Sequence, residues 1–338
     1  AAPGSVLQVR PGTYTGFQTN KSLRIVLDFT STTGSVQPPP GANYTIEVNG
    51  LAAGEPFVLV GRGAAIAPAG LGAVRIANVQ GSVVLGGLTV AVGSGYIALD
   101  VQNAANVLVE NSYFGGRNAL QIQDASLASS GVTWSSPSGF GVVALRATLE
   151  CTHGSFAGWR APALRATDSA VRLAGNGSTT LRVNGSPTGP VAAFEAIQTD
   201  VQWEPSRFVL VPANGAPGLL QVGGQLAVAD VPGLVTIGGP PGSTMTVRMT
   251  RAGSAPGLIV LGNLVPAHTA FGLTGIFWDQ GQPVIVLAVG TVDLVGLARQ
   301  APWPNVPWLL GEVFCCQGVV VLPNGALLRS GPGSWAAL

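Results

Sequence analysis

One pentapeptide occurs twice in the chain, as Ala144-Leu145-Arg146-Ala147-Thr148 and again at residues 163–167. The two copies start 19 residues apart, which is too short for a duplicated domain and too long for a hairpin. The spacing fits one coil of a solenoid, in which each turn of chain lays a strand beside the previous one. Ala-Leu pairs at residues 98–99 and 119–120 extend the series, with steps of 21, 25 and 19 residues. Irregular steps of this size are typical of a parallel β-helix.

Alternation along each strand divides every repeat into an inner and an outer side. Side chains of a strand point to opposite sides with period 2, so Leu120 and Ile122 share an apolar side that we expect to line the core. The opposite side is polar. Stacking the four repeats about 4.8 Å apart predicts two outward columns, which read Asp-Gln-Arg-Arg and Gln-Gln-Thr-Thr, and we call the first of them the predicted column. It contains Asp100, Gln121, Arg146 and Arg165.

The composition bounds the classes of protein to which the chain can belong. Its 338 residues are 9% charged, where about 25% is usual, and its net charge is +1. Binding to nucleic acid is not expected, because phosphate contacts require clustered cations. A transmembrane helix is not expected either, because no apolar run reaches the roughly 20 residues of a spanning helix. The small residues at 1–3 are typical of what signal-peptide cleavage leaves, so we expect a secreted protein.

The chain has three cysteines, Cys151, Cys315 and Cys316. The adjacent pair on a strand would point to opposite sides, so one of the two could reach Cys151. A bridge between the neighbours themselves needs a distorted peptide unit. The residues alone leave open a disulfide of either kind and three buried free thiols. No spacing of Cys and His predicts a metal site, and no motif indicates a cofactor.

The N-terminal segment carries a recognisable pattern. A strand at residues 6–9 leads into Arg-Pro-Gly-Thr-Tyr-Thr-Gly at 10–16, and Lys-Ser-Leu-Arg-Ile follows at 21–25. This pattern resembles the entry coil of secreted right-handed parallel β-helix proteins, the pectin-lyase-like superfold. The resemblance implies a right-handed parallel β-helix, which we place at residues 1–237. It assigns no activity by itself, because many proteins with this fold are not enzymes.

A Gly-Gly-Pro-Pro-Gly stretch at residues 238–242 predicts a domain boundary. Alternation at 244–249, apolar runs at 258–261, 284–289 and 318–322, and the turn at 323–325 predict an antiparallel β-sandwich over residues 238–338. The segment resembles a C-terminal β-domain found on large secreted bacterial proteins. The resemblance rests on residues 242–244, 255–257, 304–307, 310–311, 317 and 325–330, and it implies a cap, an export determinant or a contact module.

Motifs for catalysis are sparse. Hydrolases of the superfold need paired carboxylates, but Asn-x-Asp, Asp-Asp and Gly-His-Gly do not occur. Pectate lyases of the superfold carry Arg-x-Pro-x-x-Arg, where an Arg abstracts the proton α to a uronate carboxylate and bound calcium acidifies that proton. Residues 160–165 match this motif and would give that role to Arg165, but Asp168 is the only Asp within ten residues. His153 is a weaker candidate beside the simpler interpretation of a corner histidine. Enzyme activity therefore stays open, and the sequence favours a non-enzyme.

Two surfaces are candidates for binding. The predicted column suits an acidic glycan, because stacked Arg side chains clamp carboxylates, although a solvated strand face is the simpler interpretation. Trp303 and Trp308 bracket two prolines on one loop and could stack on sugars or anchor a protein contact, unless they belong to the core.

The sequence as a whole favours a secreted structural protein of the bacterial cell surface that assembles with copies of itself. Such a protein would be a subunit of a filament, appendage, sheath or surface layer. An apolar-cored rod with few charges opposes self-association only weakly, and open solenoid ends expose unpaired strands. The alternatives are a module that binds extracellular polysaccharide in adhesion, and a polysaccharide lyase that acts through Arg165.

Overall fold

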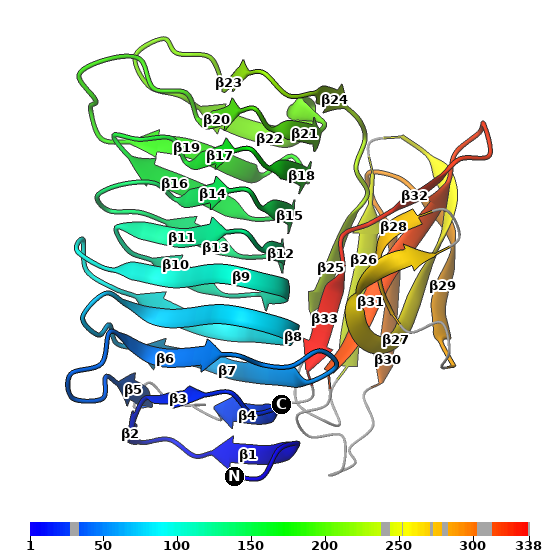
Figure 1. Cartoon of the computed structure of the whole chain (residues 1–338). Coiled ribbons are helices and arrows are strands. Elements are labelled where there is room, and N and C mark those ends of the chain that lie inside the picture. The colour runs from blue at the N-terminus through cyan, green and yellow to red at the C-terminus, as the bar shows by residue number, and fades with distance from the viewer. Residues whose placement is uncertain are drawn as a thin grey trace.

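The computed structural model describes residues 1–27, 34–237, 244–251, 253–270, 273–278, 283–302 and 313–336. Nearly every described element is a strand, and the exception is the 3₁₀ turn η1 (Pro205–Arg207). A parallel β-solenoid forms the N-terminal part, and an antiparallel sandwich lies along one side of it (Figure 1). The predicted fold class is confirmed.

Each coil of the solenoid contributes strands to three parallel stacks, which form three faces. The long strands β7, β8 and β9 bend round corners and contribute to more than one face. Face 1 contains β1 (Ser5–Val9), β4 (Leu23–Leu27), β7 (Pro56–Ile66), β8 (Gly72–Ala91), β9 (Ile97–Glu110), β12 (Ser126–Ser130), β15 (Thr148–Thr152), β18 (Ala170–Ala174), β21 (Asp200–Trp203) and β24 (Leu226–Val228).

The other two faces are built in the same way. Face 2 contains β2 (Thr13–Thr15), β5 (Ser35–Gln37), parts of β7 and β8, β10 (Tyr113–Gly115), β13 (Thr133–Ser135), β16 (Ser155–Trp159), β19 (Thr179–Asn184) and β22 (Phe208–Val211). Face 3 contains β3 (Phe17–Thr19), β6 (Tyr44–Asn49), parts of β8 and β9, β11 (Asn118–Gln123), β14 (Val142–Leu145), β17 (Leu164–Thr167), β20 (Phe194–Ile197) and β23 (Leu219–Val222).

The core consists of inward columns in which each side chain lies on its counterpart one coil away. The pairing of strands places apolar residues at the same inward position in coil after coil, so their contacts remove almost all of this surface from water. One such column on face 3 contains Ile46, Val74, Leu99, Leu120, Val142, Leu164 and Phe194.

Single residues with a positive φ turn the chain from face 3 to face 1. Asn78, Asn103 and Asp124 occupy this corner with φ of 53°, 49° and 50°. Asn and Asp are the non-glycine residues that most readily adopt this conformation. Arg146 follows in the same series with φ 48°, and its amide donates to the carbonyl of Thr167 at 3.0 Å. The corner therefore turns tightly without interrupting the hydrogen bonding between coils.

The two pentapeptide copies do not stack on each other as the sequence predicted. Val142, and not Leu145, pairs with Leu164. Leu145 is therefore half-buried on the outer side, although the alternation had placed it in the core. Arg146 follows the end of β14 at the corner, so it is not the strand neighbour of Arg165.

An inward column decides this register. Ala144 lies between Ile122 and Ala166 on the inside of face 3. Because side-chain direction alternates, a slip of one residue would turn Ala144 outward and Leu145 inward. The repeat satisfies alternation in either phase, so only its neighbours in the adjacent coils select one.

The C-terminal part contains two antiparallel sheets with a shared core. The first has β25 (Gly233–Ile237), β26 (Thr244–Thr250) and β30 (Leu297–Pro302). The second has β27 (Ala255–Ala270), β28 (Leu273–Trp278), β29 (Ile285–Val292), β31 (Val313–Val321), β32 (Leu327–Arg329) and β33 (Gly333–Ala336). Leu234 and Met249 of the first sheet pack with Ile259 and Val320 of the second. Since β25 belongs to this part, the antiparallel architecture begins before the boundary expected at 237/238.

Face 1 of the solenoid carries the sandwich. Val58, Val84 and Leu108 point outward from it and pack with Cys315 of β31. A strand that is covered on both sides shows successive apolar residues instead of alternation. The stretch at residues 57–60, Phe-Val-Leu-Val, has this pattern and is the sequence signal that could have located the docking face.

Candidate functional site

The outward column on face 3 is a ladder of paired polar groups. Asp100 and Gln121 are neighbours in it as predicted, and Arg165 lies in the same column. Val143 occupies the position expected for Arg146. In register the column contains Gln18, Glu47, Arg75, Asp100, Gln121, Val143, Arg165 and Glu195.

Asp100 is covered, with 1% of its surface exposed. The Tyr44 hydroxyl donates to its Oδ2 at 2.7 Å, and the Gln102 amide donates to both carboxylate oxygens at 3.2 and 3.1 Å. Burial, and then the hydrogen bond to Asp100, raise the pKa of Tyr44. The guanidinium of Arg75 lies between Glu47, at 3.6 Å, and Asp100, at 3.9 Å. These carboxylates are therefore engaged within the fold.

Arg165 is held on both sides. Its Nε donates to Glu195 Oε2 at 2.6 Å, and its guanidinium lies 4.4 Å from the centre of the Phe140 ring. Arg160, which opens the lyase-like motif, is an exposed residue with φ 55°. Arg165, the residue to which the lyase-like motif would give proton abstraction, is therefore engaged in an ion pair with Glu195 of the next coil.

A separate polar groove lies at the corner between face 3 and face 1, and Arg146 is one of the residues that line it. Its Nε and Nη2 donate to the two oxygens of Asp124 at 2.6 and 2.8 Å, and these bonds lower the pKa of Asp124. In the coils below, Asn103 donates to Asn78 at 3.0 Å. Together these side chains line a groove of about 380 Å³.

The three cysteines are free, buried thiols, so the disulfide considered from the sequence is not formed. Burial raises the pKa of Cys151 to about 12. Cys315 and Cys316 do point to opposite sides of their strand, as predicted. Cys315 packs against face 1 of the solenoid and Cys316 into the sandwich core.

His153 lies at the corner between β15 and β16, next to Gly233 at the start of the sandwich. Burial, and secondarily the charge of Arg207, lower its pKa to about 4. Trp303 and Trp308 lie outside the described residues. Among the residues that the structure does describe, no three His, Cys, Asp or Glu side chains gather as metal ligands, and no helix has the length and apolarity to cross a membrane.

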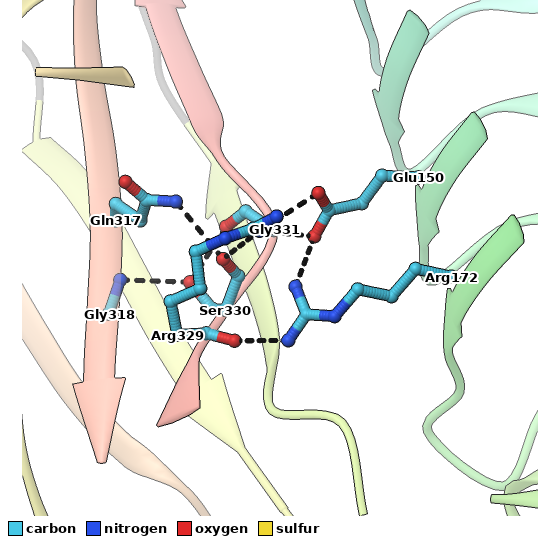
Figure 2. A network of polar contacts seen from close by, with 7 residues as sticks. All are labelled: Glu150, Arg172, Gln317, Gly318, Arg329, Ser330 and Gly331. Carbon is cyan, nitrogen blue, oxygen red and sulfur yellow. Dashed lines mark hydrogen bonds and ion pairs between the residues drawn. The ribbon is translucent and has the colours of Figure 1, made fainter. Parts of the chain in front are cut away.

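A polar network that the sequence did not predict joins the sandwich to face 1 (Figure 2). Arg329 of β32 donates through Nη1 to both oxygens of Glu150 on β15, at 2.7 and 2.8 Å. Arg172 on β18 donates to the same carboxylate and to the carbonyl of Arg329. Burial by itself would raise the pKa of Glu150, but the charges of Arg329 and Arg172 outweigh it and lower that pKa.

The sandwich side of this network is fixed by its own hydrogen bonds (Figure 2). Gln317 donates to the carbonyl of Ser330 at 3.2 Å, and the Ser330 hydroxyl accepts from the Gly318 amide at 2.8 Å. A cleft of about 300 Å³ opens beside the network between face 1 and Arg329. The sequence gives no local signal for this site, because Arg329 is more than 150 positions away from both Glu150 and Arg172.

The two ends of the solenoid form a further pair of surfaces. At the N-terminal end a mainly apolar hollow of about 420 Å³ is lined by inward residues that include Leu7, Val9 and Phe17. At the C-terminal end Leu220, Leu226 and Val228 are exposed. The ends lie at opposite extremes of the molecule, with β1 at one and β24 at the other (Figure 1).

No family model and no curated protein matches the sequence. Among solved structures, the chain aligns with the enzymatically active domain of tailspike protein 2 from bacteriophage CBA120, at 9% identity and a TM-score of 0.39. The alignment covers 97% of this chain and 72% of that chain. By its own fold, the protein is a parallel β-solenoid with a docked antiparallel sandwich.

Proposed function

We propose that the chain is a structural subunit of a bacterial cell surface and assembles with copies of itself through the ends of its solenoid. The observation that carries the proposal is that apolar side chains of the first and last described coils are exposed, whereas their neighbours one coil further in are buried. Leu7 is 36% exposed, whereas Ile25, its neighbour in the same inward column, is 4% exposed. At the other end Val228 is 62% exposed above Trp203, which is 2% exposed.

The terminal strands support the same proposal. In the part of the chain that the structure describes, β1, β2 and β3 each pair on one side alone, with β4, β5 and β6. The strands β22, β23 and β24 likewise pair only with β19, β20 and β21. Unpaired strand edges are templates for pairing with another chain. Fully covering an apolar side chain such as Leu or Val stabilises by about 1.5–3 kcal/mol, so a second copy that covers an open end gains from both terms.

Light scattering and negative-stain microscopy of the purified chain test the proposal. We expect particle mass to rise with concentration and extended assemblies to appear on the grid. Val228→Asp places a charge in the open core and should reduce assembly. Val289→Asp introduces the same charge at an exposed residue of β29 in the sandwich and is the matched control. A sharp monomer at high concentration, with no filaments, would contradict the proposal.

The location at the cell surface is a second part of the proposal. It is supported by the low content of charged side chains, which suits dense packing at a surface. Immunogold labelling of intact source cells should mark the outside of the envelope. Label confined to the cytoplasm would contradict the proposed location at the cell surface. The proposal of self-assembly would be unaffected by that result.

Polysaccharide binding is a second candidate function, favoured by the corner groove of Asn78, Asn103, Asp124 and Arg146. A groove of about 380 Å³ with amide and charged groups on adjacent coils is suited to hydrogen bonding with sugar hydroxyls. A glycan array probed with the wild type and with Asn103→Leu tests it. Binding that this substitution abolishes would support the candidate, and an array without signal for the wild type would remove it.

A further inference from the structure

We infer that the cleft between face 1 and the sandwich binds one neutral sugar unit, and that a sugar bound there holds the sandwich on the solenoid. The cleft has a volume of about 300 Å³ and lies beside the polar network of Figure 2. This volume is at the lower end of the range for pockets that hold small ligands, about 300–1,000 Å³, and such pockets often occur between packed domains. The site lies within one copy of the chain, so the inference does not rest on the proposed self-assembly.

Two alanines make the hollow in face 1. The outward side chains of face 1 form two neighbouring columns here, one of Glu150, Arg172, Gln202 and Ala227 and the other of Thr148, Ala170 and Asp200. Ala170 and Ala227 contribute only a methyl group among longer side chains, so the surface is lower at these two positions. Arg329 of β32 lines the cleft from the sandwich side. The cleft therefore has an apolar floor and polar walls that come from both parts of the chain.

Polar groups with unused hydrogen-bonding capacity line this cleft. One carboxylate oxygen of Asp200 accepts from the backbone amide of Gln225 at 2.8 Å, and the other forms no hydrogen bond with a described residue. The side-chain amides of Gln202 and Gln225 form none within the described ranges either. A carboxylate accepts hydrogen bonds, an amide both donates and accepts them, and a hydroxyl does both as well. The hydroxyls of a sugar ring match this mixture, and its CH groups match the methyl groups of the floor.

The charges around the cleft favour an uncharged ligand. Arg172 and Arg329 are balanced by Glu150 and Asp200, and all four residues line the cleft. An anion would meet the two carboxylates and a cation would meet the two guanidinium groups, so neither gains from the net charge. An ion would also lose part of its hydration on entering the cleft, which is costly without a dedicated counter-charge. A neutral sugar avoids this cost.

A bound sugar would contact both parts of the chain. The floor belongs to the solenoid and Arg329 belongs to the sandwich, so the site loses one wall when the sandwich moves away from face 1. A ligand that binds one arrangement and not the other shifts the equilibrium toward the arrangement it binds. With the sugar at about ten times its Kd, the opening constant at β32 should fall about tenfold.

Saturation-transfer NMR with glucose, galactose, mannose and N-acetylglucosamine tests the site. We expect at least one of these neutral sugars to bind the wild type, and glucuronate, which adds a negative charge, to bind less tightly than the best of them. Ala170→Leu fills the floor and Gln202→Leu removes an amide, and both positions point outward, away from the core. Each substitution should weaken binding at least tenfold, a loss of about 1.4 kcal/mol. Ala91→Leu makes the same change as Ala170→Leu at an exposed position of β8 on face 2 and should bind as the wild type does.

The outcomes decide both halves of the inference. No binding of any of the four sugars, or tightest binding of glucuronate, would overturn it. Thr148 also lines the corner groove, so Asn103→Leu separates the two sites. Binding that Asn103→Leu abolishes and Ala170→Leu retains would place the sugar in the groove and overturn the inference. Sugar binding that leaves hydrogen exchange at β32 unchanged would overturn the coupling to docking.

Assembly is measured without sugar, so failure of this inference and failure of the proposed self-assembly are distinguishable. Circular dichroism of each variant confirms that it is folded before sugar binding is compared.

Discussion

The contact between the sandwich and the solenoid is predicted to depend on the carboxylate of Glu150. Glu150→Gln keeps the shape of the side chain but removes the negative charge between Arg172 and Arg329. Both guanidinium groups are largely buried, with 15% and 13% of their side chains exposed, so they would be left without a counter-charge. Breaking a buried pair by removing one partner costs about 3–5 kcal/mol.

Hydrogen exchange measured by mass spectrometry tests this prediction, because it reports local opening without requiring the whole chain to unfold. A loss of about 3 kcal/mol corresponds to a roughly 150-fold increase in the opening constant. We expect this increase at β32 and at the two strands of face 1 that it contacts, β15 and β18. Little change is expected in β11 and β14, which lie on face 3. The exposed pair of Asp124 and Arg146 gives the control, since Asp124→Asn should leave exchange at the interface unchanged.

A change of less than about fivefold at β32 would refute the reasoning, because it would mean that the network adds little to the docking of the sandwich. The pH dependence gives a second check. The folded pKa of Glu150 is lowered, so its stabilisation is present above the unfolded pKa and is lost as the pH falls through the folded value. Wild-type exchange at β32 should therefore rise in acid toward that of Glu150→Gln.

Three further predictions concern His153, the three cysteines and Gly87. His153 has a folded pKa of about 4 against 6.5 unfolded, so the unfolded chain binds the proton first and stability should fall by about 3 kcal/mol between pH 6.5 and pH 4. His153→Asn should flatten that part of a plot of urea midpoint against pH, and an unchanged slope would show that other groups cause it. The thiols of Cys151, Cys315 and Cys316 should resist a thiol reagent at pH 8 until urea unfolds the chain, and fast labelling of the native protein would contradict their burial. Gly87→Ala should destabilise by about 2 kcal/mol or more, because Gly87 has φ +62° and a Cβ there would lie 1.9 Å from the Gly61 carbonyl oxygen. Gly95→Ala meets no neighbour within 4 Å, so its thermal midpoint should match the wild type, and equal midpoints for both variants would refute the clash.

The sequence by itself determined the class of fold. Period-2 alternation is a local property of a strand, so Leu120 and Ile122 could be assigned to the core before any partner was known. Turn residues are also a local signal, which is why an antiparallel part could be expected in the last 101 residues, at 238–338. The stacking of Asp100 on Gln121 could be predicted by the same reasoning, because the two residues lie one coil apart.

Only the tertiary structure decided the register and the docking. Alternation leaves two phases open for the pentapeptide, and the inward contacts of Ala144 with its neighbours in adjacent coils select one of them. The network of Glu150, Arg172 and Arg329 depends on which face of the solenoid the sandwich covers. That choice is made by apolar contacts between residues far apart in the chain, so no window of sequence contains both partners.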